Sequence, residues 1–293
     1  MKEVLRKVRK LEIKIRRMVN DLFAGEYHAA FKGQGLEFDE VRHYQYGDEI
    51  RAIDWNVTAR TGQAYIKQFK EERERTLFVL FDISGSEDFG NEAENKLLIG
   101  TEIAAILAFS ALKNNDKIGM STFSDQIEQY FPPQKGRKHV LAIVRNLLNN
   151  RAEHLGTAMG KALDFIRKTQ KRRSILLIIS DFLDQNYEQP LISIARKHEV
   201  ILIRLFNPRE VMGSGYGTIP TLDMETGNLA WINAGDSVYG KELSKEFEKI
   251  DTNLNHLAKK YKMDYLSINV QKDYFPVLEL FFKTRKDRIR SHH

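Results

Sequence analysis

Residues 77–86 read Leu-Phe-Val-Leu-Phe-Asp-Ile-Ser-Gly-Ser, and this stretch decides the fold. Its first five residues are all apolar, which predicts a strand buried on both faces, as in the parallel sheets of α/β proteins. The strand ends at Asp82, and the spacing of Asp82, Ser84 and Ser86 places their side chains on one side of the departing loop. Because serine and aspartate are also common turn and cap residues, this segment alone is compatible with a structural role.

Two further segments carry oxygen-bearing side chains at corresponding positions. Asp181 closes the apolar run 175–180, and Thr157 follows a glycine where a helix is expected to begin. In doubly wound sheets, ligands bind where loops leave the carboxyl ends of the strands. We therefore expect one cation to be held by Asp82, Ser84, Ser86, Thr157 and Asp181. Carboxylate and hydroxyl oxygens suit a hard ion, above all Mg²⁺, with Mn²⁺ or Ca²⁺ as alternatives.

From residue 76 onward, apolar strand candidates alternate with helix candidates. Strands are expected at 76–83, 117–123, 126–131, 174–180, 200–206 and 263–270. Helices are expected at 94–113, 138–148, 158–169, 190–197, 241–260 and 275–288. We expect Pro132-Pro133 to stop the third strand, and 222–232 to form a hairpin with its turn at 225–227. The pattern predicts an α/β, doubly wound, mostly parallel sheet over residues 76–291, with a hairpin excursion at about 210–235.

The first 75 residues have a different pattern. Apolar residues recur at three- and four-residue steps between residues 3 and 23, which predicts an amphipathic helix whose other face is basic. The polar, glycine-containing stretch 25–63 favours loops and short strands, and residues 64–70 alternate like a strand with one exposed face. We therefore assign residues 1–75 to a small N-terminal α+β extension.

Composition limits the possible environments and partners. The chain has no cysteine, which excludes disulfides, thiolate metal sites and cysteine nucleophiles. The first twenty residues do not resemble a secretory signal, and the apolar helix at 97–112 falls short of the roughly 20 residues that a membrane crossing needs. We expect a cytoplasmic protein without a transmembrane segment. The net charge of +6 is concentrated at both ends, so nucleic-acid binding through the basic N-terminal helix stays open as an alternative.

The enzyme motifs that the sequence approaches are all incomplete. A phosphatase of the haloacid dehalogenase type needs a second aspartate where this chain has Ser84. The chain contains no Gly-x-Ser-x-Gly motif, and Glu242 stands where a P-loop requires serine or threonine. A metal-dependent hydrolase at Asp82 and Asp181 stays open as an alternative, although the sequence identifies no positioned base. We therefore expect a binding protein and not an enzyme.

The five oxygen-bearing residues resemble the metal-ion-dependent adhesion site (MIDAS) of von Willebrand factor A domains. The resemblance implies that Ser84, Ser86 and Thr157 touch the ion, whereas Asp82 and Asp181 act directly or through water. Because only two of these five residues are charged, the ion would stay electrophilic. An acidic residue from a protein partner would then complete its coordination.

A second resemblance covers nearly the whole chain from about residue 25. Residues 44–62 read Tyr-Gln-Tyr-Gly-Asp-Glu-Ile-Arg-Ala-Ile-Asp-Trp-Asn-Val-Thr-Ala-Arg-Thr-Gly, and this segment is similar to the signature of the DUF58 family, as are residues 67–73 and 223–231. Members are commonly linked with MoxR-type AAA+ ATPases of bacteria. The resemblance implies a chaperone-like, partner-binding component in protein assembly, maturation or remodelling. Some members carry transmembrane helices and a further β domain ahead of this region, and we expect a shorter form without them.

The charged and aromatic residues of the signature segment have two interpretations. They could form ion pairs under aromatic cover that hold the N-terminal segment against the sheet, or they could form a surface that contacts a partner. The residues concerned are Tyr44, Tyr46, Asp48, Arg51, Asp54, Trp55 and Arg60. Neither interpretation gives them a catalytic role.

Overall fold

The computed structural model describes residues 36–71, 75–88, 95–149, 152, 154, 156–210, 218–222, 229–233 and 237–291. The chain divides into two compact units, one formed by Phe31–Arg75 and the other by Met1–Ala30 with Thr76–His293. The predicted N-terminal helix at 3–23 and the predicted hairpin turn at 225–227 lie outside the described residues. The domain limits of 1–75 and 76–291 therefore stay a prediction.

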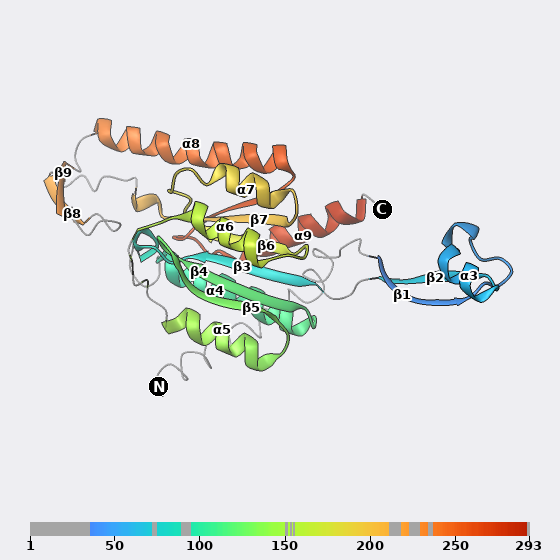
Figure 1. The fold of residues 1–293 in the computed structure, drawn as a ribbon. Coiled ribbons are helices and arrows are strands. Elements are labelled where there is room, and N and C mark those ends of the chain that lie inside the picture. Colours follow the sequence, from blue (N-terminus) through green and yellow to red (C-terminus); the bar gives the residue numbers. More distant parts are fainter. Residues whose placement is uncertain are drawn as a thin grey trace. The chain divides into compact units, whose positions relative to one another are not determined.

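A six-stranded sheet forms the centre of the larger unit, with strand order β10-β7-β6-β3-β4-β5 (Figure 1). Its strands are β3 (Thr76–Asp82), β4 (Lys117–Phe123), β5 (Ile127–Gln134), β6 (Ile175–Ser180), β7 (Glu199–Phe206) and β10 (Asp264–Asn269). All neighbours are parallel except β4 and β5. The order reverses between β3 and β6, which makes the sheet doubly wound with a topological switch point there. The predicted fold class is thus confirmed.

Burial explains why the central strands lack the alternation of polar and apolar residues. Every residue of β6 is buried, as is every residue of β3 after Thr76. Helices cover both faces of these strands, so neither face tolerates polar side chains along the strand. The edge strand β10 is buried only at Leu266 and Ile268, which is the pattern of a strand with one partly exposed face.

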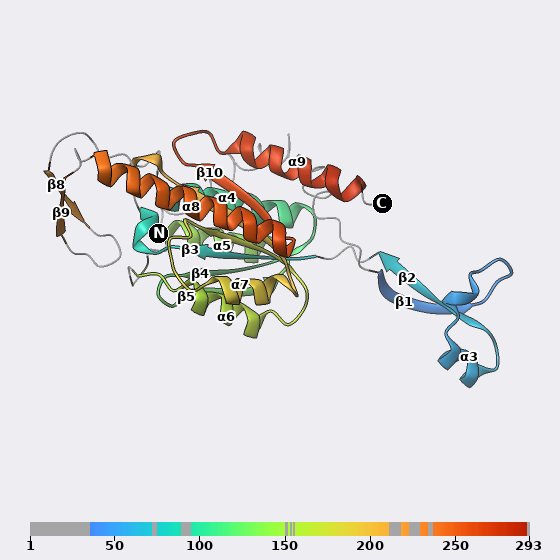
Figure 2. The same ribbon diagram turned by 90° about the horizontal axis from the view of Figure 1, so that it is seen from above.

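Helices form a layer on each face of the sheet. Apolar side chains of α6 (Met159–Thr169), α7 (Glu188–Ala195) and α8 (Ser237–Tyr261) form one core cluster with residues of β3, β6 and β7. Helices α4 (Lys96–Lys113) and α9 (Phe275–Ser291) lie on the opposite face from α6 and α7 (Figure 2), and α5 (Arg137–Asn149) packs against α4. Among the described helices, none combines the length and the apolar character needed to cross a membrane.

The edge strand β5 corrects one sequence-based prediction, because it continues through Pro132 and Pro133 to Gln134. A proline removes no ladder hydrogen bond when its nitrogen faces away from the neighbouring strand, as an edge position allows. The register between β4 and β5 shifts near Gly119, which marks a bulge. A Cβ at Gly119 would lie 2.9 Å from Pro133 Cγ, so the glycine leaves room for the Pro133 ring.

The hairpin excursion is present in the described residues. Strands β8 (Thr218–Leu222) and β9 (Leu229–Asn233) pair antiparallel, with Leu222 opposite Leu229. The first strand therefore begins earlier than the sequence-based boundary at residue 222. Helix α8 likewise begins at Ser237, ahead of the predicted boundary at residue 241.

The smaller unit is built on an antiparallel pair of strands, β1 (Leu36–His43) and β2 (Tyr65–Glu71). A 3₁₀ turn, η2 (Ile50–Ala52), and a short helix, α3 (Trp55–Thr61), lie between these strands in the chain. The sequence pattern of residues 25–63 predicts only loops and short strands here. Asp54 begins α3 by accepting hydrogen bonds from Asn56 N at 3.0 Å and Val57 N at 3.3 Å. Gly62 ends it with a φ of 73°, so local capping and not an apolar pattern defines this helix.

Candidate functional site

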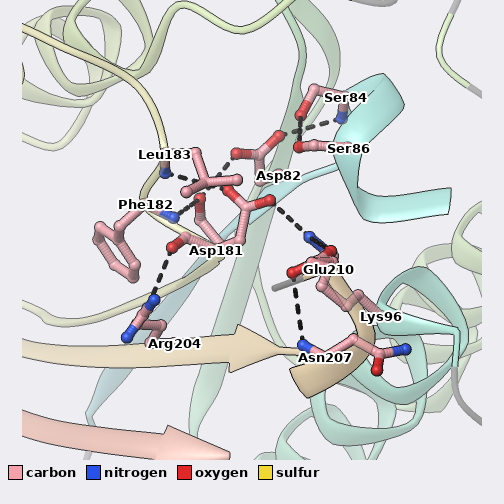
Figure 3. A network of polar contacts seen from close by, with 11 residues as sticks. Asp82, Ser84, Ser86, Lys96, Asp181, Phe182, Leu183, Arg204, Asn207 and Glu210 are labelled. Carbon is pink, nitrogen blue, oxygen red and sulfur yellow. Dashed lines mark hydrogen bonds and ion pairs between the residues drawn. The ribbon is translucent and has the colours of Figure 1, made fainter. Parts of the chain in front are cut away.

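Asp82 and Asp181 emerge at the same edge of the sheet, next to the switch point. Strands β3 and β6 are neighbours whose register pairs Phe81 with Ile179, so the two aspartates follow adjacent strand ends. Their exposed fractions are 0% and 3%, respectively. In Figure 3 their carboxylates point toward the region that also receives the hydroxyls of Ser84 and Ser86.

The segment after β3 folds around the Asp82 carboxylate. Ser84 N donates a hydrogen bond of 3.0 Å to Asp82 Oδ1, and Ser180 Oγ donates one of 2.7 Å to Asp82 Oδ2. The hydroxyl oxygens of Ser84 and Ser86 lie 3.3 Å apart, at the start of the 3₁₀ turn η3 (Gly85–Asp88). Both carboxylate oxygens are thus oriented by the protein, and the two hydroxyls lie close enough to act on one ion.

Thr157 reaches this edge from a third segment. The next residue, Ala158, donates from its backbone N to Ser124 O at 2.9 Å, just after the end of β4. Met159 N donates to Asp184 Oδ2 at 2.7 Å, in the loop that follows Asp181. Thr157 therefore lies between the end of β4 and the loop after β6. The structure brings all three oxygen-bearing segments to one edge of the sheet.

The electrostatics of this edge favour an added positive charge. Burial, reinforced by the negative charge of Asp181, raises the pKa of the Asp82 carboxyl to about 7. Without a further cation, the folded chain therefore resists ionising Asp82 beside the negative charge of Asp181. A divalent cation between them would relieve this repulsion, so the buried carboxylates fit such an ion.

The donor set fits a hard cation better than a soft one. Among the residues that the structure describes, no cluster of three or more histidine, cysteine, aspartate or glutamate residues could hold a metal ion by itself. Serine and threonine hydroxyls would therefore have to supply the remaining ligands. Hydroxyl and carboxylate oxygens without nitrogen or sulfur are typical of magnesium, calcium and manganese sites.

The structure also places a buried lysine at this edge, a position that the sequence pattern does not predict. Lys96 Nζ lies 2.6 Å from Asp181 Oδ2 and 2.6 Å from Glu210 Oε1, and its side chain is 0% exposed (Figure 3). Lys96 is the first residue of α4, and Asn95 caps the helix by accepting a hydrogen bond from Leu98 N. A lysine in the first helical turn opposes the helix dipole, and that mismatch was the available signal in the sequence.

Glu210, the second partner of Lys96, comes from the opposite side of the switch point. It ends the 3₁₀ turn η4 (Pro208–Glu210), which follows β7. Glu210 N donates to Asn207 O at 3.0 Å, which closes the turn. Burial raises the pKa of the Glu210 carboxyl, whereas the nearby Lys96 ammonium acts in the opposite direction.

A groove borders the site on the side of α8. It has a volume of about 860 Å³ and is lined by residues 182–189 together with Glu246, Lys249, Ile250 and Asn253. Leu183, at the start of this lining, is 40% exposed, and its backbone N donates to Asp181 Oδ1 at 3.1 Å. One wall of the groove is therefore attached directly to a residue of the candidate metal site.

The signature residues lie in the smaller unit and form other contacts than those expected. Asp48 binds Arg42 through two hydrogen bonds of 2.8 Å, and the carboxylate of Asp54 caps α3, with Lys67 Nζ at 3.8 Å. The side chains of Tyr46 and Trp55 are 104% and 66% exposed, and the expected aromatic cover stays a prediction. Of the remaining signature residues, Tyr44 is half-buried, and the exposed ones are Arg51 and Arg60.

Sequence comparison gives the family of this chain. Residues 40–252 match the family described as "Protein of unknown function DUF58". The uncharacterized protein Rv1480 of Mycobacterium tuberculosis is 30% identical over 223 residues, which cover 75% of this chain and 70% of that protein. YeaD of Bacillus subtilis is 32% identical over 107 residues, which cover 36% of this chain and 25% of YeaD.

Two solved structures are also similar. BatB from Bacteroides thetaiotaomicron is 14% identical, with a TM-score of 0.47 over 73% of this chain and 99% of BatB. The SpRpn10 VWA domain is 11% identical, with a TM-score of 0.40 over 73% of this chain and 94% of that domain. The family match spans most of the larger unit and part of the smaller one. The chain belongs to the DUF58 family.

Proposed function

We propose that this chain is a divalent-metal-dependent protein-binding module. One observation carries the proposal: two buried strand-end carboxylates, Asp82 and Asp181, share the switch-point edge with the paired hydroxyls of Ser84 and Ser86. Thr157 supplies the fifth oxygen from the neighbouring loop. We propose Mg²⁺ as the ion, because the donors are all hard oxygens.

The protein ligands determine how much of the cation's positive charge the site neutralises. Ser84, Ser86 and Thr157 would contribute neutral oxygens, and the hydrogen bonds from Ser84 N and Ser180 Oγ orient the Asp82 carboxylate. When bound, the cation would supply a Lewis-acidic position open to one further ligand. Because the protein supplies few charged ligands, a carboxylate from a partner protein would be a favourable addition. We therefore propose binding and not catalysis.

The surface beside the site supports a protein as the ligand. The groove that begins at Phe182 and Leu183 would accept residues that flank the partner's acidic side chain. Family membership supports a MoxR-type AAA+ ATPase as the functional partner, in the assembly, maturation or remodelling of other proteins. We propose the cytoplasm as the location, which cell fractionation would test.

Metal binding by the purified chain tests the first half of the proposal. Millimolar Mg²⁺ should raise the melting temperature of the wild-type chain, because a ligand that binds only the folded state stabilises it. The variant Asp82→Asn should lose this response. Asp164→Asn is the matched control, because it removes the same charge from a partly exposed residue paired with Arg167 on α6. An unchanged Mg²⁺ response in Asp82→Asn would overturn the proposed metal site.

Partner capture tests the second half. Immobilised wild-type chain should retain a purified MoxR-type ATPase from the same organism in Mg²⁺ and release it in EDTA. Asp82→Asn should capture less of the ATPase, whereas Asp164→Asn should behave as wild type. Capture that EDTA does not change would show that the partner binds elsewhere on the chain.

A further inference from the structure

The buried Lys96 ammonium is an unusual neighbour for a cation site. Its side chain is 0% exposed, and it contacts Asp181, one of the proposed metal ligands, at 2.6 Å. Removing an ammonium group from water is costly unless close anionic partners compensate for the lost hydration. Here two carboxylates do so, since Glu210 Oε1 lies equally close.

The charges at this edge explain why a lysine is tolerated. Asp82, Asp181 and Glu210 bring three carboxyl groups into a largely buried region, where even the least buried of these side chains, that of Glu210, is only 11% exposed. Lys96 offsets part of this negative charge and occupies one oxygen of Asp181. A metal ion that coordinates the same oxygen would have to displace the ammonium.

We propose that Lys96 is a tethered cation that competes with the divalent metal ion for Asp181. Glu210 is the carboxylate that holds the ammonium when the metal takes Asp181. This inference rests on the proposed metal-dependent function and deepens it. It assigns Lys96 as the residue that sets metal affinity, so that the metal alone binds more weakly than the oxygen donors would otherwise allow.

The local structure allows the exchange without a change in the backbone. Asn95 caps α4 through Leu98 N and holds the helix start in place, while the four methylene groups of Lys96 can adjust. Glu210 is held by its own turn, through its hydrogen bond to Asn207 O. Only the ammonium therefore needs to shift, from a position shared by two carboxylates toward one of them.

The competition also indicates the kind of partner that the site prefers. A carboxylate from a partner adds negative charge next to the metal ion. It therefore favours the metal ion over the Lys96 ammonium at Asp181. A basic or neutral ligand adds no negative charge and so does not favour the metal ion in this way. Metal and an acidic protein segment should therefore bind cooperatively at this edge, each raising the affinity for the other.

Calorimetric titration with Mn²⁺ or Mg²⁺ alone tests the inference. Lys96→Met should bind the metal about tenfold more tightly or better, because the competing charge is gone. Lys113→Met is the matched control: it removes the same charge from the last residue of the same helix, about 25 Å away along the axis. Its metal affinity should stay within about twofold of wild type.

A double variant separates competition from net charge and covers a failure of the single variant to fold. Lys96→Met with Glu210→Gln keeps the wild-type net charge, and it removes both members of one ion pair. It should still bind metal more tightly than wild type. Equal or weaker binding by both Lys96 variants, with wild-type binding intact, would overturn the role of Lys96 and leave the proposed function standing. If neither wild type nor any variant binds the metal ion, then both the role of Lys96 and the proposed metal-dependent function are wrong.

Discussion

Replacing Asp82 by asparagine should change how the stability of the metal-free protein depends on pH. Burial, together with the charge of Asp181, raises the pKa of Asp82 to about 7 from its ordinary 3.8. Between these values the folded chain holds a proton that the unfolded chain has released. The free energy of unfolding should therefore fall as the pH rises through this interval. The contribution is fully present below about pH 4 and is lost above about pH 7.

The size of the effect follows from the same two pKa values. Each pH unit within the interval changes the free energy of unfolding by about 1.4 kcal/mol. Over about three units, this gives a loss of about 4 kcal/mol by pH 8. An asparagine side chain has no proton to lose, and its oxygen can still accept the hydrogen bond from Ser84 N.

Urea denaturation in EDTA between pH 4.5 and pH 8 measures the effect. Wild type should lose stability relative to Asp82→Asn as the pH rises, so that the variant is the more stable protein at pH 8. Added Mg²⁺ at pH 8 should restore wild type and leave the variant unchanged. Asp164→Asn serves as the control, since it removes one carboxylate that already pairs with Arg167 at the surface.

One outcome would refute this reasoning directly. If Asp82→Asn is less stable than wild type at pH 8 in EDTA, then the ionised carboxylate stabilises the metal-free fold. In that case Lys96 or another group neutralises both aspartates without a metal ion. The charges at this edge would then not favour a divalent cation.

Three further substitutions test the packing near this site, an ion-pair cluster at the opposite edge of the sheet, and a helix cap in the smaller unit. Gly100→Ala should cost about 1 to 3 kcal/mol in urea denaturation, because a Cβ there would lie 2.5 Å from Phe81; unchanged stability would mean that the ring can move. Asp54→Ala should cost about 1 kcal/mol and speed amide exchange in α3 through loss of the cap, and unaltered exchange would contradict that role. Arg285→Met should lower the free energy of unfolding in urea by about 2 to 4 kcal/mol, because the buried guanidinium pairs with Glu199 on β7 and Asp264 on β10. A smaller loss would mean that these ion pairs contribute little to stability.

The central sheet was predictable because burial on two faces leaves a strong pattern. Five consecutive apolar residues before Asp82 and six buried residues in β6 have few other structural explanations in a chain of this size. Helix α3 was missed for the opposite reason. Its sequence has no buried face, and its limits depend on the Asp54 cap and on the positive φ of Gly62.

The prolines of β5 show how tertiary context reverses a local rule. Pro132 and Pro133 predict a strand end, because proline lacks the N–H that a ladder requires. In the folded chain this strand lies at the sheet edge, with a bulge opposite Gly119, where the absence of a Cβ leaves room for the ring of Pro133. Neither the edge position nor the bulge is visible before the strand order is known.

The candidate site was partly predictable for a topological reason. A residue that ends a parallel strand must emerge at the carboxyl edge, so the meeting of Asp82 and Asp181 required only that β3 and β6 be neighbours. Lys96 and Glu210 were missed because neither ends a predicted strand. One opens a helix and the other closes a short turn, and such positions converge only in the folded chain.

Strand order explains why Lys96 and Glu210 both lie near Asp181. A right-handed crossover from β3 to β4 must start its helix at the edge where β3 ends, so the first residue of α4 lies next to the site. The turn after β7 arrives at the same edge, because β7 is the other neighbour of β6. The charges of these two positions therefore act on Asp181 from both sides. If metal affinity is tuned anywhere in this fold, substitutions at Lys96 and Glu210 should change it more than equal changes of charge at other helix starts.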